Sequence, residues 1–528
     1  MKKILILFVT VFTLCLFSFE SKASYIYTEF GGIEASEPMK VKKILDSNSL
    51  VKIEADGSET KIAIGEIVDM VQCEDLLYIL DKTNACFHVL DKEYHVVGTY
   101  TGNAQDDKSL LHQAEGIYVI PTTTVDKQGN VFKAQKIYIA DTQYKHMDDN
   151  NNPIYANANG EISMEPLEGY TQKTGRIFTL TKTSTHKFTS IDKLIYEKPL
   201  DPSIKDIAFN PVKITVDPDG RVYCIGQNIY EGIIDYNPDG TFNRFFGSNK
   251  VSSLGFWSIF FSASQRKKVG VKLQTQFNNL IIDDKNFIFT VSKSTETQFV
   301  QRLNYQGTNV LKQNGMVAVK GDVSWQQQYD TIPTGPSNFV DIDYNQNGYY
   351  SVLDDNRSRV FTYDLEGNLL YVFGQKGTLQ TSSQKAVSMT YFDEDILVSD
   401  RTNKNIIVYE PTEFGKLINE ATSLNNKGLY EDAKQIWEQI LSINSNCLLA
   451  YTGIGISEYK QGNYKAAMDN FEKGYDRENY SKAFKEYRDQ EMEKFYPVIM
   501  VLIIAGVGWI FVSSFKGQIR DVKEGVDN

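Results

Sequence analysis

The chain has 528 residues, of which 41% are hydrophobic and 12% are aromatic, and its 55 basic and 67 acidic side chains give a formal net charge of −12. Because nucleic-acid phosphates require a basic surface, this charge excludes a nucleic-acid partner from our expectations. A polyanion of any other kind is disfavoured for the same reason.

The first 23 residues have the order of an export signal. Two lysines precede an apolar run at residues 4–17, and small residues follow up to Ala23. This order is typical of a secretory signal peptide, so we expect residues 1–23 to be removed and the mature chain to begin near Ser24. We expect residues 24–64 to form an N-terminal strand and a lead-in to the first domain.

Four cysteines remain after the expected signal: Cys73, Cys86, Cys224 and Cys447. Their spacing lacks the CxxC pattern of a metal or redox motif. Cys73 and Cys86 flank one short hairpin at its opposite ends, too far apart for the Cα separation of a disulfide. We therefore expect four free thiols.

A strand-and-turn unit recurs between residues 65 and 414. Four copies of one strand end on Asp, at residues 76–81, 136–141, 349–354 and 395–400, and two weaker copies lie at 221–226 and 286–292. A polar turn, a second strand and a hairpin turn with glycine follow, as at Gly240, Gly307 and Gly367. The period from Asp354 to Asp400 is about 46 residues, which in an all-β chain indicates propeller blades. The six copies predict a mainly β fold with a six-bladed β-propeller over residues 65–414.

The turn after each strand carries a recognisable pattern. The best copies are Asp81 with Asn84, Asp354 with Asn356 and Arg359, and Asp400 with Asn403. This pattern resembles the blades of NHL-repeat propellers, and the resemblance covers roughly residues 65–410. It implies a fold and no particular activity, because such propellers include enzymes, ligand binders and scaffolds. A short Asp side chain can cap the turn that follows it, and we predict that role for the recurring Asp rather than catalysis or metal binding.

Insertions near residues 144–175, 252–270 and 315–336 lengthen the blades. In repeat folds, such insertions tend to collect on the binding face. The first holds Asp and Asn oxygens but lacks the order of a calcium-binding EF-hand loop, so a solvated loop is predicted. The other two hold our candidate partner-binding residues: Phe256, Trp257, Phe260, Phe261 and Trp325. The first four form an apolar block that docks a partner, touches the membrane surface or packs on the propeller's own edge. Trp325 stands among glutamines, a setting that suits either a sugar ring or ordinary loop packing.

The sequence contains no assembled catalytic motif. All five histidines lie in the first two blades or their loops without a metal-ligand spacing, and neither a nucleophile elbow nor a phosphate-binding loop is present. We expect no catalytic, cofactor-binding or metal-binding residue and no enzyme activity. A carboxylate Ca²⁺ site in the propeller channel stays open as the alternative, and with it a metal-dependent hydrolase or lactonase.

Helical periodicity replaces the strand pattern from Gly415 onward. A repeat appears at an interval of 34 residues, in which Gly428, Tyr430, Ala433 and Trp437 recur as Gly462, Tyr464, Ala467 and Phe471. The repeat resembles two tetratricopeptide (TPR) units over residues 415–482, and the resemblance implies either a peptide-binding groove or a rigid spacer. We expect residues 483–496 to form a capping or linker helix.

Residues 497–515 are apolar and uncharged, and they are long enough as a helix to cross a bilayer. Residues 516–528 begin with Lys516 and carry further basic residues, which favours a cytoplasmic C-terminus. These features predict a single-pass protein of the cell membrane with its N-terminal ectodomain outside the cell.

The combination resembles membrane-anchored NHL-repeat proteins of anaerobic Gram-positive bacteria, which implies an architecture and a location more than an activity. We expect an extracytoplasmic binding or scaffold protein, a subunit of a transport or envelope complex. Its expected partners are membrane proteins of that complex or a peptide in the TPR groove. A carbohydrate receptor that binds a glycan is a further alternative.

Overall fold

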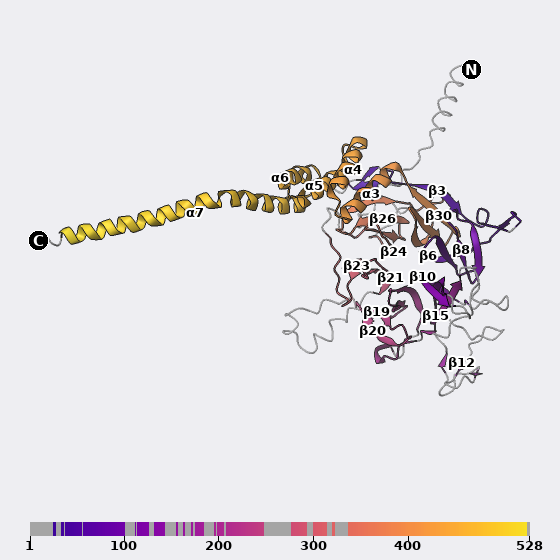
Figure 1. Cartoon of the computed structure of the whole chain (residues 1–528). Coiled ribbons are helices and arrows are strands. Elements are labelled where there is room, and N and C mark those ends of the chain that lie inside the picture. Colours follow the sequence, from indigo (N-terminus) through magenta and orange to yellow (C-terminus); the bar gives the residue numbers. More distant parts are fainter. Residues whose placement is uncertain are drawn as a thin grey trace, which may run out of the picture. The chain divides into compact units, whose positions relative to one another are not determined.

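The computed structural model describes residues 25–27, 33–35, 37–54, 56–100, 111, 113–125, 131–142, 155–156, 162–163, 171–172, 175–183, 195–196, 198–204, 207, 209–247, 276–292, 299–313, 319–322 and 336–524. The chain divides into two compact units, one ending at Ser423 and the other beginning at Leu424. The first unit consists mainly of strands and the second of helices (Figure 1).

Six antiparallel sheets, blades 1 to 6, make up most of the described part of the first unit. Blade 1 contains β6 (Ile67–Cys73), β7 (Leu76–Asp81), β8 (Cys86–Leu90) and β9 (Val96–Tyr100); blade 2 contains β10 (Ala114–Val125), β11 (Val131–Asp141), β15 (Arg176–Thr183) and β16 (Ile195–Tyr196). Blade 3 contains β17 (Pro211–Val216), β18 (Val222–Gly226), β19 (Ile233–Tyr236) and β20 (Phe242–Phe246); blade 4 contains β21 (Phe277–Ile282), β22 (Ile288–Ser292) and β23 (Val300–Leu303). Blade 5 contains β24 (Phe339–Asn345), β25 (Tyr349–Asp354), β26 (Arg359–Asp364) and β27 (Leu369–Phe373), with β1 (Tyr25–Tyr27) and β2 (Ile33–Ala35) added at its edge. Blade 6 contains β28 (Ala386–Phe392), β29 (Asp395–Asp400), β30 (Asn405–Pro411) and β3 (Met39–Leu45).

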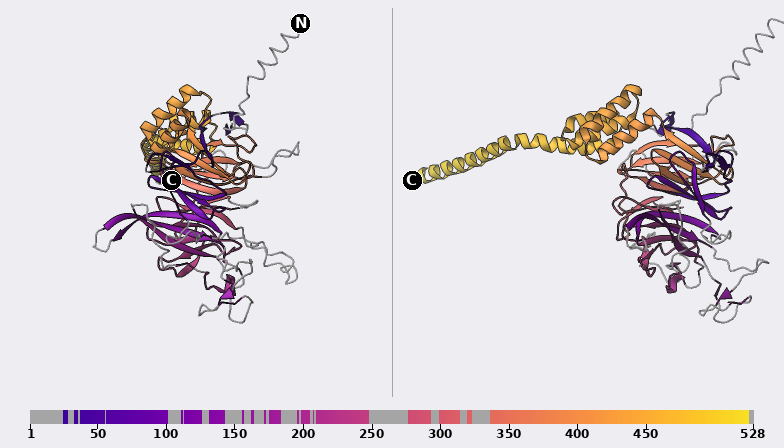
Figure 2. Two further views of the ribbon diagram at one scale, coloured as in Figure 1. Left: turned by 90° about the vertical axis from the view of Figure 1, so that its right-hand side faces the viewer. Right: turned by 45° about the vertical axis from the view of Figure 1, so that its right-hand side comes forward.

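The innermost strands of the six blades form a closed ring. Their contacts run from β6 to β10, β17, β21, β24 and β28, and from β28 back to β6. Figure 2 shows the sheets of this unit from two further sides. The ring confirms the predicted mainly β, six-bladed β-propeller. Each of the six strands that define the sequence repeat is the second strand of its blade.

The N-terminal strand closes the ring. β3 pairs antiparallel with β30, in a register that sets Met39 opposite Pro411 and Leu45 opposite Ile406. The last blade therefore takes its outermost strand from the start of the chain. This strand lies within residues 24–64, and its part in the last blade was not recognised in the sequence.

The core lies between facing blades. All six residues of β25 and of β29 are buried, because each sheet is covered by a neighbour on both faces. Phe87, Ile137 and Phe178, for example, belong to one apolar cluster that joins blades 1 and 2. Burial of each such side chain contributes about 1.5–3 kcal/mol.

The remaining small elements of the first unit lie outside the six blades. They are the pair β4 (Val51–Ile53) and β5 (Glu59–Lys61), the short strands β12 (Tyr155–Ala156), β13 (Ile162–Ser163) and β14 (Thr171–Gln172), and the 3₁₀ turn η1 (Pro202–Ile204). The hairpin glycines Gly240, Gly307 and Gly367 have positive φ, as predicted for these turns.

Five helices follow the propeller: α3 (Glu413–Asn426), α4 (Tyr430–Ile443), α5 (Leu448–Lys460), α6 (Tyr464–Lys473) and α7 (Arg477–Glu524). Within the second unit, α4 packs on α5, α5 on α6, and α6 on the start of α7. The 34-residue sequence interval is also present in the backbone. Gly428 and Gly462 each stand shortly before a helix, and both glycines have a positive φ, of +79° and +83°.

Candidate functional site

The recurring Asp at the end of the second strand caps its turn. Asp81 accepts hydrogen bonds from the backbone N–H of Asn84 at 3.0 Å and of Gly65 at 2.7 Å. Asp400 repeats this arrangement with the backbone N–H of Asn403 at 3.0 Å and with that of Gln384, two residues before its blade's first strand, at 2.5 Å. The predicted capping role is confirmed for Asp81 and Asp400, and in both cases the same carboxylate also ties the second strand to the entry of the first.

Five polar residues and one glycine occupy one equivalent position of the innermost strands. In each blade, this residue follows a β-bulge and pairs with the next-to-last residue of the second strand of the repeat. We call the set the inner layer: Asp69, Gly116, Lys213, Asn279, Asp341 and Ser388. All six residues are buried except Lys213, whose side chain is 12% exposed. Since five different residue types occupy this position in the six blades, no motif marks it in the sequence.

One ion pair of the inner layer passes over an intervening blade. Lys213 of blade 3 donates to a carboxylate oxygen of Asp69 in blade 1, with Nζ and Oδ1 2.6 Å apart. Blade 2 places Gly116 at this level, where an added Cβ would lie 2.6 Å from the carbonyl oxygen of Val212. Glycine therefore allows β17 to approach β10 closely, and it leaves no side chain in the path of the lysine.

The carboxylates of the inner layer also hold neighbouring innermost strands together. Asp69 accepts the backbone N–H of Ile117 in the next blade at 2.8 Å, and Asp341 accepts that of Met389 in the next blade at 2.7 Å. The amide of Asn279 donates to the other oxygen of Asp341. One edge of each innermost strand pairs with the second strand of its blade, and the opposite edge has no ladder partner. The carboxylates therefore satisfy N–H groups at that edge that would otherwise be unpaired.

Asp343 lies two residues further along β24 and links the same two strands, β24 and β28, one level along the strand. Its carboxylate accepts the backbone N–H of Tyr391 at 2.8 Å and the hydroxyl of Thr390 at 2.9 Å. Burial raises the pKa of Asp343 to about 6, although these hydrogen bonds favour the charged form. Carboxylates thus link β24 to β28 at two successive levels.

The charges of Asp69, Lys213 and Asp341 shift one another's pKa values. Burial raises the pKa of Asp341 to about 7, the charge of Lys213 opposes this rise, and the charge of Asp69 adds to it. Burial also raises the pKa of Asp69, against the attraction of Lys213. Burial alone would lower the pKa of Lys213, but the charges of Asp69 and Asp341 outweigh it and raise that pKa. Lys213 is therefore the resident counter-ion of two buried carboxylates.

The carboxylate oxygens of the inner layer are better suited to bonds within the protein than to binding Ca²⁺. Ca²⁺ takes six to eight oxygen ligands. Here one oxygen of Asp69 is bound to an ammonium group, and the oxygens of Asp341 accept from Asn279 and Met389. The positive charge of Lys213 opposes a divalent cation at the same place.

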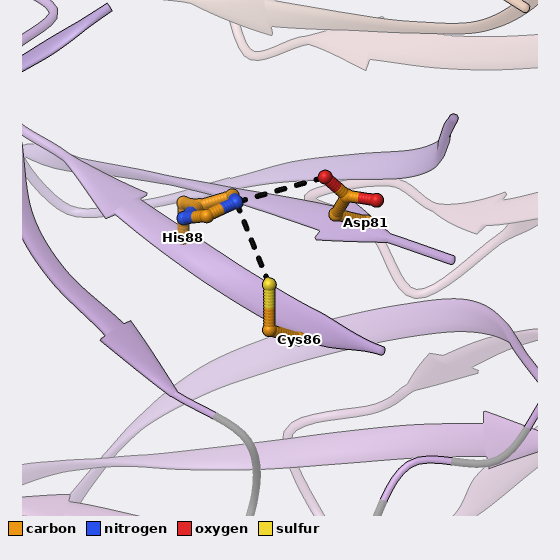
Figure 3. A group of neighbouring side chains, drawn as sticks. All are labelled: Asp81, Cys86 and His88. Atoms are coloured by element: carbon orange, nitrogen blue, oxygen red, sulfur yellow. Dashed lines mark hydrogen bonds and ion pairs between the residues drawn. The ribbon is translucent and has the colours of Figure 1, made fainter. Parts of the chain in front are cut away.

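A second group of chemically active side chains lies in blade 1. Asp81, Cys86 and His88 offer donor atoms that all lie within 4.8 Å of one another, and all three are buried (Figure 3). Nε2 of His88 lies 3.5 Å from Sγ of Cys86 and 3.8 Å from Oδ2 of Asp81. The sequence alone did not reveal this group, because it depends on the pairing of β7 with β8. The four cysteines at positions 73, 86, 224 and 447 form no disulfide bond, as predicted.

The candidate partner-binding residues lie outside the described part of the chain. They are Phe256, Trp257, Phe260, Phe261 and Trp325, and the Asp-rich centre of the insertion near 144–175 lies outside it as well. They remain predictions.

The helical unit is held by aromatic side chains packed on glycine. Trp437 of α4 is buried against Gly453 of α5, where an added Cβ would lie 2.4 Å from its ring. Phe471 of α6 meets Gly455 of α5 in the same way at 2.7 Å. Trp437 and Phe471 occupy the same position in the two copies of the 34-residue repeat. Their equivalent packing gives the sequence repeat a structural counterpart.

The C-terminal part of α7 is apolar and exposed. The helix contains a stretch apolar and long enough to cross a membrane, and none of it is buried within the protein. Trp509 and Phe511 are each 73% exposed. A soluble helix rarely exposes such a continuous apolar surface to water.

No protein-family model matches the chain, and no curated protein matches its sequence. Among solved structures, it is similar to virginiamycin B lyase from Staphylococcus aureus, with 11% identity, a TM-score of 0.32, and 65% of this chain and 94% of that chain covered. It is also similar to a chain of the nidogen/laminin complex, with 15% identity, a TM-score of 0.32 and coverage of 61% and 88%. A third is the major Malassezia sympodialis allergen Mala s 1, with 10% identity, a TM-score of 0.36 and coverage of 65% and 92%. At these identities and TM-scores, the similarities carry no information on activity.

Proposed function

We propose that the protein is an extracytoplasmic scaffold, anchored by one helix, whose propeller and helical unit bind other proteins of a membrane complex. The observation that carries this proposal is the apolar, unburied stretch of α7, which continues without a break from the helical unit. A lipid bilayer is the environment that best accommodates it. The export signal and Lys516 after the stretch support an outside location for the propeller and a cytoplasmic tail.

The two unit types support binding in different ways. We propose that the propeller is of the NHL type and that the helices α3 to α6 are two TPR units, whose groove takes a peptide of a partner. The 34-residue repeat and the equivalent packing of Trp437 and Phe471 support the second assignment.

We propose binding rather than catalysis. The inner layer supports this view, since its carboxylates are engaged by Lys213, Asn279 and backbone N–H groups of the ring. A metal-dependent hydrolase or lactonase needs open coordination positions. This arrangement gives that alternative no support.

Photo-crosslinking of the full chain in its membrane tests the proposal. A photoreactive amino acid at Tyr305 of the propeller or Tyr475 of the helical unit would probe two exposed positions, which are 75% and 55% exposed. The same group at Phe511 is the control, because we expect that side chain to face lipid. We expect a reproducible protein adduct from Tyr305 or Tyr475 and only lipid adducts from Phe511. Absence of any protein adduct from both ectodomain positions would contradict a scaffold role.

A further inference from the structure

We propose that Asp81, Cys86 and His88 form a binding site for one zinc-like, thiophilic divalent cation. Asp81 ends β7, and Cys86 begins β8 directly opposite it in the register. His88 lies two residues further along β8, so its side chain is on the same face as that of Cys86. The hairpin thus brings an oxygen, a sulfur and a nitrogen donor to one place.

The spacing of the donor atoms fits a small tetrahedral ion. Zinc binds sulfur at about 2.3 Å and nitrogen or oxygen at about 2.0–2.2 Å, which sets its tetrahedral ligands roughly 3.3–3.6 Å apart. Nε2 of His88 lies 3.5 Å from the Cys86 sulfur and 3.8 Å from the Asp81 oxygen. The Cys86 sulfur and the Asp81 oxygen lie within 4.8 Å of each other, so these two side chains would have to approach by up to about 1.2 Å for all three donors to surround one ion.

The surroundings orient the ligands. Nδ1 of His88 is hydrogen-bonded to Oγ1 of Thr99 at 2.8 Å, and His88 and Thr99 are paired across β8 and β9. This bond directs the other ring nitrogen, Nε2, toward Cys86 and Asp81. The carboxylate of Asp81 is held by the N–H of Gly65 and the amide of Asn84, at 2.7 and 2.8 Å. Hydrogen bonds of this kind to ligand side chains are usual at metal sites.

Charge balance favours a divalent ion. The side chains of Asp81, Cys86 and His88 are 0–4% exposed, and an unpaired charge is costly in such a dry place. A divalent cation with one carboxylate, one thiolate and one neutral imidazole has no net charge. Binding displaces the proton of the Cys86 thiol, and the fourth coordination position is left to a water molecule or a small ligand.

Blade 1 differs from the other blades at the positions of Cys86 and His88. Opposite the capping Asp, blades 2, 5 and 6 carry Arg176, Arg359 and Asn405 where blade 1 has Cys86. Two residues further on, these blades carry the core side chains Phe178, Phe361 and Ile407 where blade 1 has His88. Capping of the turn requires neither a thiol nor an imidazole, so both replacements call for another explanation.

Cobalt binding to the detergent-solubilised full chain tests the site. After treatment with a chelator, we expect one equivalent of Co²⁺ per chain, with a thiolate-to-cobalt charge-transfer band in the near-ultraviolet. Cys86→Ser and His88→Phe should lose the band, and His88→Phe should fold because blades 2 and 5 carry Phe at this position. Cys224→Ser is the matched control, a second buried free cysteine in another blade, and should keep the band.

A zinc-induced thermal shift provides a second readout that does not require every variant to be equally stable. Wild-type chain should gain thermal stability on addition of Zn²⁺, and Cys86→Ser should not. Absence of the band and of the shift in wild type, or a band that survives Cys86→Ser, would overturn the proposal and leave a structural Asp81–His88 contact.

Discussion

Replacement of Lys213 by Met tests whether the inner layer depends on its resident cation. Lys213 and Asp69 are 2.6 Å apart, and their side chains are only 12% and 11% exposed. Met keeps most of the side-chain volume but removes the charge, so two buried carboxylates lose their counter-ion. Removal of one partner of a buried pair costs about 3–5 kcal/mol. We therefore expect Lys213→Met to lower the free energy of unfolding at pH 8 by about this amount.

The loss should depend on pH. Asp69 and Asp341 both have raised pKa values, that of Asp341 to about 7. At pH 5, Asp341 is already protonated in the native state, so less uncompensated charge remains. The destabilisation by Lys213→Met should therefore be smaller at pH 5 than at pH 8.

Denaturant unfolding of the detergent-solubilised full chain at both pH values measures this effect. Lys312→Met is the control, because Lys312 pairs with Glu366 where both side chains are about half exposed, and such a surface pair contributes only about 0–1 kcal/mol. The reasoning is refuted if Lys213→Met costs no more than Lys312→Met, or if its cost is the same at pH 5 and pH 8.

Three further predictions follow from the described contacts. The pKa of Asp341 rises from 3.8 to about 7 on burial, so between these pH values the native state holds a proton that the unfolded chain has released. Stability therefore falls as pH rises from about 4 to about 7, by up to about 4 kcal/mol from this group, and unfolding curves of Asp341→Asn should show a shallower pH dependence. Gly116→Ala should cost about 1–3 kcal/mol, because its Cβ would lie 2.6 Å from the carbonyl oxygen of Val212. Gly517→Ala, where an added Cβ within helix α7 meets nothing within 4 Å, should not destabilise the protein in the same unfolding assay. Trp437→Ala should destabilise the helical unit by about 3–5 kcal/mol, since the side chain is 2% exposed, and limited proteolysis should then cut this unit at lower temperature than in wild type.

The propeller could be predicted from the sequence because its signal is local and repeated. The strand that ends on Asp, the capped turn and the hairpin glycine lie within about 30 residues of one another, and they recur along the chain. The helical repeat is similar, since Trp437 and Phe471 stand at equal offsets from Gly428 and Gly462. Short-range turn chemistry and side-chain periodicity are sufficient for such predictions.

The sites could not be predicted, because they depend on distant pairing. Lys213 meets Asp69 only when the ring is closed, over 144 residues of sequence. The approach of His88 to Asp81 requires the register of β7 and β8. Ring closure by β3 depends on pairing with β30, and the two strands lie at opposite ends of the propeller sequence. In each case, tertiary geometry selects the partner, and local composition contains no sign of it.

The location of the propeller is the claim on which the proposed function depends most, and cysteine labelling in intact cells tests it directly. The four cysteines that remain after the expected signal peptide are buried, so Leu200→Cys, at a residue 99% exposed on the propeller, provides a single reactive thiol. A membrane-impermeant maleimide should label Leu200→Cys in intact cells, and Asn528→Cys only after the membrane is permeabilised. The opposite pattern, with Asn528→Cys labelled in intact cells and Leu200→Cys protected until permeabilisation, would contradict the account.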